Sequence, residues 1–171
     1  VPKAGRTASE AGLLAQCRLA GIVPDGVLPA PLGLYNAYRA DQPPDGTDVL
    51  VDIGAENTDL LIVERGNLRW MRSVTMAGDQ ITRTLEKKFH IPFEEAEKLK
   101  RNVANAKQAE RLFGVMKPVL RTLTGEIQRS LGYYRAQHEG VRIRRVVAIG
   151  GGFRLPGMVA FFREVLQYPV E

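Results

Sequence analysis

Cysteine, histidine and long apolar runs are scarce in this chain of 171 residues, which has one cysteine and two histidines. Cys17 has no second thiol with which to form a disulfide, and His90 and His138 lie too far apart in sequence to show metal-ligand spacing. No apolar run approaches the roughly 20 residues that a transmembrane helix requires. The sequence therefore argues against a disulfide framework, a cysteine–histidine metal centre and a membrane span within these residues.

Hydrophobic residues make up 44% of the chain and charged residues 25%, the composition of a soluble globular protein. The net charge of +5 permits acidic partners without requiring them. The densest basic cluster consists of Arg142, Arg144 and Arg145. We interpret it as the solvated start of a strand. Because no aromatic residues alternate with these arginines, nucleic acid is not an expected partner. The chain has no initiator methionine, and we expect both of its ends to be cuts in a longer protein.

The first 45 residues carry two helical patterns followed by a linker. Thr7 to Glu10 has the sequence of a capping box, and the apolar face that follows includes Cys17, which is expected to be a small core residue. Pro31 is expected to open a second helix that extends to Tyr38. The segment from Asp41 to Gly46 is rich in proline, aspartate and glycine, and we place a domain boundary there.

Three segments after this boundary are predicted to be the strands of an antiparallel meander: residues 49–54, 59–63 and 68–76. The first is nearly continuously apolar, as in a strand buried on both faces. The third alternates, and Leu68, Trp70 and Arg72 are expected on the same side of it.

Helical patterns dominate the remainder of the chain. Apolar residues at helical spacing follow the third strand, and Pro92 starts another helix. Residues 106–137 are predicted to form a long helix, with a kink or break expected near Gly114 to Pro118. Val146 to Ile149 reads as a fully buried strand that leads into three glycines and a last helix. The predicted fold is α/β: a mixed sheet, an antiparallel meander plus one parallel strand, covered by helices.

The turn after the first strand is a candidate anion site. Asp52 ends a buried strand, where a carboxylate is costly unless a cation pairs with it, and Mg²⁺ or its water shell could do so. Gly54 would let backbone N–H groups approach a phosphate, and Thr58 offers a hydroxyl. The alternative is an ordinary hairpin turn in which Asp52 accepts local hydrogen bonds.

The segment Gly150-Gly151-Gly152 is the second candidate, because a buried strand there passes through glycines to a helix N-terminus, where a ligand can approach the backbone. A tight strand-to-helix turn would need the same residues. A third segment, Ala77 to Thr82, ends the third strand and opens a helix, and Asp79 there is explained as an ordinary N-cap or first-turn residue.

These segments occur in a fixed order: a DxGxxxT hairpin, a glycine-opened helix, an EEAEKLK helix and a GGGxxxPG loop. The set resembles the actin-like ATPases of the PilM and FtsA type, and the PilM type most closely, over about residues 19–171. The resemblance implies an RNase H-like lobe in residues 46–171, with a helical insertion at about 83–118. Residues 1–45 would then end a first lobe and form the linker.

The resemblance also implies a site for ATP and Mg²⁺. Phosphates would lie near Asp52, Gly54, Asn57 and Thr58, with Asp52 binding Mg²⁺ through water. The ribose would border Gly78 and Gln80. Glu97 and Lys100 would approach the ribose or base, and the glycines at 150, 151 and 152 would contact the adenosine. No residue stands out as a catalytic base, so slow hydrolysis or none is expected.

The partner implied is the cytoplasmic tail of an inner-membrane pilus assembly protein of the PilN type. Self-assembly is compatible with the resemblance, contact with the membrane would be indirect, and the location would be cytoplasmic, next to the bacterial inner membrane. Because the family's first phosphate motif is absent, the chain would supply one wall of the cleft.

Two alternatives stay open. A scaffold without nucleotide is suggested by Ala77, where the family usually has glycine, and by Glu56; a sugar kinase would need a base outside these residues.

Overall fold

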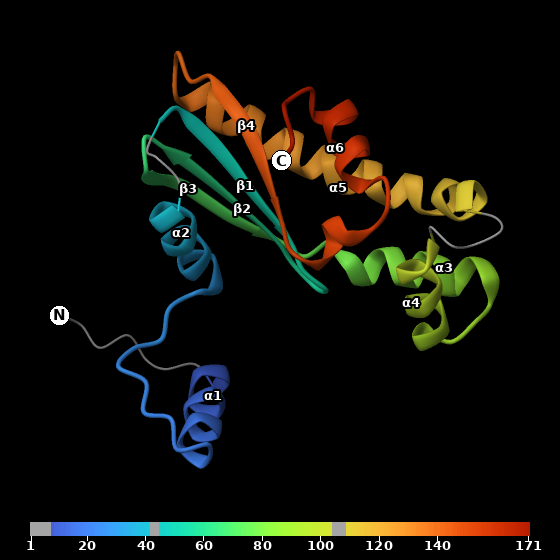
Figure 1. The fold of residues 1–171 in the computed structure, drawn as a ribbon, viewed down its shortest axis with the longest axis horizontal. Helices are drawn as coiled ribbons and strands as arrows, with labels where there is room; N and C mark the ends of the chain where they lie inside the picture. Colours follow the sequence, from blue (N-terminus) through green and yellow to red (C-terminus); the bar gives the residue numbers. More distant parts are fainter. Residues whose placement is uncertain (1–7, 42–44, 104–108) are drawn as a thin grey trace.

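A computed structural model describes residues 8–41, 45–103 and 109–171. The elements follow the predicted order along the chain (Figure 1), and their bounds are α1 Ala8–Leu19, α2 Ala30–Asp41, β1 Thr47–Ile53, β2 Thr58–Glu64, β3 Asn67–Val74, α3 Gly78–Phe89, α4 Phe93–Arg101, α5 Ala109–Gln137, β4 Ile143–Ile149, a 3₁₀-helix Gly151–Arg154 and α6 Met158–Leu166. The strand order is β3-β2-β1-β4, with β4 parallel to β1 and the other pairs antiparallel. The predicted mixed sheet is therefore confirmed.

A bulge in β3 places Leu68 and Trp70 on opposite faces of the sheet. Leu68 pairs with Val63 and Trp70 pairs with Ile62, so that Arg69 is an extra residue in the ladder. Leu68 consequently packs with the cluster on one face of the sheet and Trp70 with the cluster on the other. The prediction that Leu68 and Trp70 point to the same side of the strand is wrong, because the extra residue interrupts the alternation of side chains between the two faces of the sheet.

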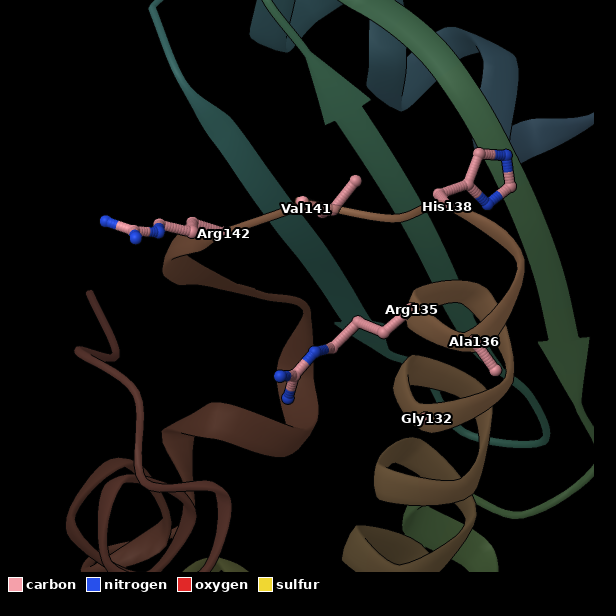
Figure 2. Close-up of a pocket in the computed structure, with 7 residues that line it drawn as sticks. Gly132, Arg135, Ala136, His138, Val141 and Arg142 are labelled. Atoms are coloured by element: carbon pink, nitrogen blue, oxygen red, sulfur yellow. The ribbon is translucent and has the colours of Figure 1, made fainter.

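Strand β4 is less buried than predicted, since only Val146 among its seven residues is buried. It has β1 on one side, and on the other it meets only the C-terminal segment, where Val146 bridges to Val170. Figure 2 shows the connection from α5 to β4, on which His138, Val141 and Arg142 lie. Gly140, between His138 and Val141 in sequence, adopts a φ of +77°. The expected full burial is wrong because β4 is close to the edge of the described sheet.

A second bulge, at the start of β4, gives Arg144 and Arg145 a structural role that was not predicted, although Arg144 is exposed as expected. The register shifts between Thr47 and Asp48, and both arginines donate hydrogen bonds to the buried carboxylate of Asp48. Arg145 also pairs with Glu171. These two arginines are thus structural groups, and within the predicted cluster Arg142 and Arg144 are exposed whereas Arg145 is half-buried.

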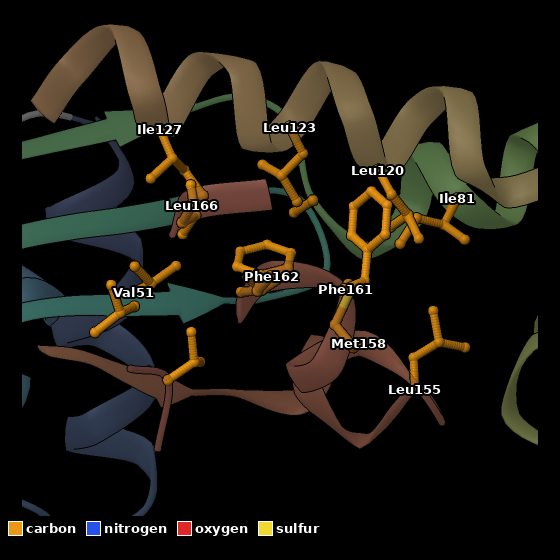
Figure 3. Close-up of a cluster of buried hydrophobic side chains, with 14 of the residues drawn as sticks. Val51, Ile81, Leu120, Leu123, Ile127, Leu155, Met158, Phe161, Phe162 and Leu166 are labelled. Carbon is orange, nitrogen blue, oxygen red and sulfur yellow. The ribbon is translucent and has the colours of Figure 1, made fainter. Parts of the chain in front are cut away.

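Helices cover the sheet on both faces, which explains the apolar run in β1. Val49, Val51 and Ile53 point into the main core with α3, α5 and α6, whereas Leu50 points into a smaller cluster under α2. Figure 3 shows the main core, where side chains of α5 and α6 point toward one another above the sheet, among them Leu120, Leu123, Ile127, Phe161, Phe162 and Leu166.

Helix α5 is continuous over its 29 residues although Pro118 lies inside it, so the predicted break does not occur. The buried residues recur at helical spacing and tie the helix to the core, and this packing offsets the backbone hydrogen bond that proline cannot donate. The predicted start at Ala106 lies outside the described residues.

The N-terminal arm is the least buried part of the described chain, and α1 lies apart from the sheet (Figure 1). Cys17 is half-buried, so its predicted place in a core is not observed. Thr7 of the predicted capping box lies outside the described residues. Helix α2 docks on the sheet through two hydroxyl groups: Tyr35 donates to the Gly66 carbonyl at 2.8 Å and Tyr38 to Asp48 at 2.5 Å.

The domain boundary at residue 46 stays a prediction. The predicted helical insertion at 83–118 also stays a prediction, and its two limits fall inside α3 and α5. Among the described residues, no helix combines the length and apolarity that crossing a membrane requires.

Candidate functional site

The two glycine-bearing turns meet at one end of the sheet. Asp52 on β1 is the parallel neighbour of Ile149 on β4, and each strand leads directly into its turn. A Cβ atom built on Gly150 would overlap the Asp52 carboxylate and lie 2.6 Å from the Ile53 carbonyl oxygen. The predicted convergence of these turns is therefore present.

An open cleft of about 450 Å³ lies where these turns face the helical pair α3–α4. It is lined by twelve residues: Gly54, Ala55, Gly78, Asp79, Ile81, Glu97, Lys100, Arg101, Gly151, Gly152, Arg154 and Leu155. Six of them belong to the predicted site: Gly54, Gly78, Glu97, Lys100, Gly151 and Gly152. A cleft of this size is within the range of small-molecule sites.

Backbone hydrogen bonds fix the β1–β2 turn to the start of α3. The amide of Gly78 donates to the Gly54 carbonyl at 3.0 Å, and the amide of Asp79 donates to the Ala55 carbonyl at 2.8 Å. A Cβ atom on Gly78 would lie 3.1 Å from the Gly54 carbonyl oxygen, so glycine permits this close approach. The floor of the cleft is thus held rigidly by main-chain contacts.

Glu97 and Lys100 of α4 bind α3 and each other. Glu97 accepts hydrogen bonds from Thr82 at 2.6 Å and from Arg101 at 2.8 Å, and Lys100 lies 2.6 Å from the same carboxylate. Lys100 also donates to the Gly78 carbonyl at 3.1 Å. Burial alone would raise the pKa of Glu97, but the hydrogen bonds from Lys100, Thr82 and Arg101 outweigh it and lower the pKa from 4.5 to about 2. Glu97 is therefore poorly suited to accept a proton.

The three glycines of the loop have different roles. Gly150 has a φ of +89° and no room for a side chain, and a Cβ atom on Gly152 would overlap the Ile53 side chain. Both therefore serve the close packing of the loop on β1, as the alternative of a tight turn required. Gly151 has nothing within 4 Å of a Cβ position and lines the cleft, so a ligand could approach its backbone.

Asp52 lies behind this loop with a carboxylate that accepts no hydrogen bond and meets no cation among the described residues. Burial, and to a smaller extent the negative charge of Asp59, raise the pKa of Asp52. A half-buried carboxylate without a counter-ion fits a hydrated divalent cation. No cluster of three or more carboxylate, imidazole or thiol ligands occurs in the described parts of the chain, so phosphate oxygens and water would complete the shell.

Asp59 was missed in the sequence analysis. It pairs directly with Asp52 in the β1–β2 register, and Ser73 donates a hydrogen bond to it. The signal was available, because a short hairpin turn after Asp52 places the first residues of the next strand opposite it.

Besides Asp52 and Gly150, three further predicted residues do not line the cleft. The Thr58 hydroxyl is buried and donates to the Met76 carbonyl at 2.7 Å. Asn57 is exposed, and its carbonyl accepts the Gly54 amide. The Gln80 side chain accepts the Ala77 amide at 2.8 Å and so caps α3. Their hydrogen bonds stabilise the turns around the cleft.

The two departures that suggested a scaffold without nucleotide do not affect the cleft. Ala77 is 1% exposed and its side chain packs in the main core, so it does not narrow the ribose side. Glu56 is exposed and absent from the cleft lining. Neither residue therefore supports the alternative of a scaffold that does not bind nucleotide.

Sequence analysis also missed residues of the cleft rim. Arg154 is exposed at the end of the 3₁₀-helix and makes no hydrogen bond or ion pair among the described residues, and the Arg101 side chain is 75% exposed. Together with Lys100 they place three cations around the cleft, which suits a ligand that carries phosphate. The rim could not be assigned from sequence because the 3₁₀-helix that directs Arg154 was not predicted.

Comparisons with known proteins agree with this architecture. A model of the family of cell division protein FtsA matches residues 49–171. The ethanolamine utilization protein EutJ of Salmonella typhimurium is 30% identical over 139 residues, which cover 77% of this chain and 46% of that protein. The chain thus spans about half the length of the curated relatives that it matches.

Solved structures of actin-like ATPases share the fold. A chain of the PilM–PilN type IV pilus biogenesis complex matches with a TM-score of 0.80 and 31% identity, covering 95% of this chain and 47% of that chain. MreB5 of Spiroplasma citri bound to AMPPNP matches with a TM-score of 0.71 at 16% identity, covering 98% and 60% of the two chains, which supports the fold alone. Because the FtsA model covers well over half of the residues, the chain belongs to the FtsA family within the actin-like ATPase superfamily.

Proposed function

We propose that this chain forms one wall of a site for ATP and Mg²⁺, and that nucleotide binding changes its affinity for a protein partner. The observation that carries the proposal is the meeting of the Asp52 turn and the Gly151 loop at one end of the sheet, beside a cleft with three cations on its rim. Asp52 would hold the hydrated Mg²⁺, and Gly54, Gly78 and Gly151 would let the ligand approach the backbone. The base and ribose would lie toward Lys100 and Arg154.

Slow hydrolysis or none is the corresponding expectation. The carboxylates in the cleft lining are Asp79 and Glu97. Glu97 is held ionised by three donors, with a pKa of about 2, so it does not act as a general base near neutral pH. The chain would thus respond to nucleotide through linkage, in which a ligand shifts the affinity for a partner.

The proposed binding is tested by following backbone amide resonances of the protein during titration with ATP and Mg²⁺ to millimolar concentration. Because the chain spans half of its relatives, we expect weak but saturable changes at Gly54, Gly78 and Gly151. Asp52→Asn should weaken the Mg²⁺-dependent binding at least about tenfold, about 1.4 kcal/mol, whereas the matched change Glu56→Gln should leave it unchanged. Absence of saturable changes, or equal binding by the Asp52 variant, would contradict the proposal.

For the partner, we propose the cytoplasmic tail of a PilN-like inner-membrane protein, which would place the chain in the cytoplasm beside that membrane. Support comes from the PilM–PilN complex, whose matched chain covers 95% of this one. The measurement is binding of a synthetic tail peptide with and without ATP and Mg²⁺; an affinity that does not respond to nucleotide would reject the linkage.

A EutJ-like role in ethanolamine utilization is the second candidate, favoured by 30% identity over 139 residues. The two roles differ in which partner the protein captures. Nucleotide-dependent binding of the PilN-like peptide supports the pilus role, and its absence in a protein that binds ATP favours the EutJ-like role.

A further inference from the structure

Helices α3 and α4 lie side by side (Figure 1), and residues of both line the nucleotide cleft. Residues 90–92 connect the two helices, and Ala96 and Leu99 of α4 pack in or against the main core. Beside the cleft, by contrast, the contact between the helices is polar. The hydroxyl of Thr82, a residue of α3 with no exposed surface, takes part in this contact, although Thr82 does not line the cleft.

The Thr82 hydroxyl connects Lys100 to Glu97. Lys100 Nζ donates to the hydroxyl oxygen at 2.8 Å, so the single hydroxyl proton is free to go to another acceptor. Of the two acceptors nearby, Glu97 Oε2 at 2.6 Å is closer than the Gly78 carbonyl oxygen at 3.1 Å. Donation to Glu97 also contributes to the low pKa of that carboxyl group, about 2.

The same hydroxyl completes the surroundings of the Lys100 ammonium group. An ammonium has three N–H donors, and three oxygen atoms surround that of Lys100: Glu97 Oε2 at 2.6 Å, the Thr82 hydroxyl at 2.8 Å and the Gly78 carbonyl at 3.1 Å. The Lys100 side chain is only 13% exposed. These three oxygens therefore determine where the ammonium lies. Because Glu97 and Lys100 are three residues apart on α4, they are held against α3 together.

A purely structural role for Thr82 would require only that the two helices pack. An apolar contact would do this without the partial burial of an ion pair, which is weak evidence for stability. The three partners of the Thr82 hydroxyl, however, all line the cleft: Gly78, Glu97 and Lys100. The hydroxyl thus organises groups that face the ligand site from behind the wall of that site.

We propose that Thr82 is a positioning residue for the nucleotide cleft, and that its hydroxyl holds Glu97 and Lys100 in the orientation in which they meet the nucleoside part of the ligand. This role rests on the proposed function, in which base and ribose lie toward Lys100 and Arg154. Thr82 touches no ligand itself and acts through the two residues of α4. Loss of its hydroxyl should therefore impair recognition of the nucleoside and spare recognition of the phosphates near Asp52.

Titration with ATP and with inorganic triphosphate, each with Mg²⁺ and followed by amide resonances, tests this role. Thr82→Val should weaken ATP binding at least about fivefold, because hydrogen bonds to charged groups are lost, and should leave triphosphate binding unchanged. Thr82→Ser keeps the hydroxyl and should bind both ligands as the native protein does. The matched control is Thr124→Val, which removes an equally buried hydroxyl that bonds only to carbonyl groups of its own helix and should alter neither affinity.

A second measurement follows the carboxyl carbon of Glu97 as the pH is varied. Thr82→Val should raise the pKa of Glu97 above its native value of about 2, whereas Thr82→Ser and Thr124→Val should not. The amide spectra report whether each variant is folded, and Thr82→Ala, which also lacks the hydroxyl, replaces the valine variant if that variant does not fold. If triphosphate binds the native protein too weakly to measure, rescue by Thr82→Ser together with the pKa of Glu97 decides.

Three results would overturn the positioning role: native affinity for ATP in Thr82→Val, equal loss of ATP and triphosphate in that variant, or an unchanged pKa of Glu97. Each of them leaves the proposed function intact, since the native protein still binds ATP. If the native protein itself binds no ATP, the proposed function fails, and Thr82 then has no ligand to position.

Discussion

Arg144 binds Asp48 through two hydrogen bonds, Nε to Oδ1 at 2.8 Å and Nη2 to Oδ2 at 2.6 Å. Arg145 and Tyr38 donate to the same carboxylate. This arrangement arises from the bulge in β4, which sets two consecutive arginines opposite a single residue of β1. A single buried carboxylate therefore joins the sheet to α2.

Asp48→Asn should destabilise the fold by about 3 kcal/mol, because the change leaves Arg144 without its counter-charge and Arg145 with only the exposed Glu171. Burial alone would raise the pKa of Asp48, but hydrogen bonds from Arg144, Tyr38 and Arg145 lower it below 3.8. The pair therefore contributes stability above pH 3.8, and this contribution is lost as the pH falls through the lowered pKa. Urea unfolding at several pH values measures both effects.

The matched control is Glu64→Gln, which removes an exposed ion pair with Arg69 at 2.9 Å. Because exposed pairs contribute little, its effect should stay below about 1 kcal/mol. Similar losses for both variants would show that the Asp48 network is no more stabilising than a surface pair.

Gly150→Ala and Gly151→Ala should separate packing from ligand binding within one loop. The first places Cβ against Asp52 and Ile53 at a φ of +89°, so we expect a loss of at least about 2 kcal/mol. The second meets no atom within 4 Å and should change stability by less than about 1 kcal/mol. Thermal unfolding measures this difference, and equal losses would contradict the assigned roles.

Much of the fold was predictable from local patterns. The apolar run in β1 indicated burial on both faces, and the spacing of Ile81 and Leu85 predicted the buried face of α3. The sequence order of the Asp52 turn and the glycine loop, together with the family resemblance, placed both at one sheet end. The burial of β1 and of α3 depends on patterns within one element, whereas the meeting of the two turns was predicted only through the resemblance.

Features that depend on pairing between distant segments were not predictable. Arg69 and Arg144 look like ordinary alternating residues in sequence, and only the register of the neighbouring strand makes each an extra residue. Likewise, three consecutive glycines look equivalent until β1 is placed against two of them.

Glu97→Gln should remove pH-dependent stability in a defined acidic window. Since the pKa of Glu97 is lowered from 4.5 to about 2, its ionised form contributes stability above pH 4.5, and this contribution disappears as the pH falls toward 2. The variant should accordingly be less stable than the native protein at neutral pH and approach it at pH 2. Glu94→Gln, on the exposed first turn of α4, is the control.

Asp52→Asn should stabilise the protein at neutral pH even as it weakens the binding of Mg²⁺ and ATP. Burial and the charge of Asp59 raise the pKa of Asp52 above 3.8, so the folded state prefers the protonated form. The unpaired carboxylate therefore destabilises the fold increasingly as the pH rises through its folded pKa, and an amide of the same shape avoids this penalty.

The melting temperature of Asp52→Asn should accordingly exceed that of the native protein at pH 7, and the two should converge below pH 3.8. Added ATP and Mg²⁺ should raise the melting temperature of the native protein more than that of the variant, because a ligand that binds only the folded state stabilises it. A variant that melts below the native protein at pH 7 would show that the Asp52 carboxylate already has a stabilising partner, which would remove the physical reason to assign it a cation.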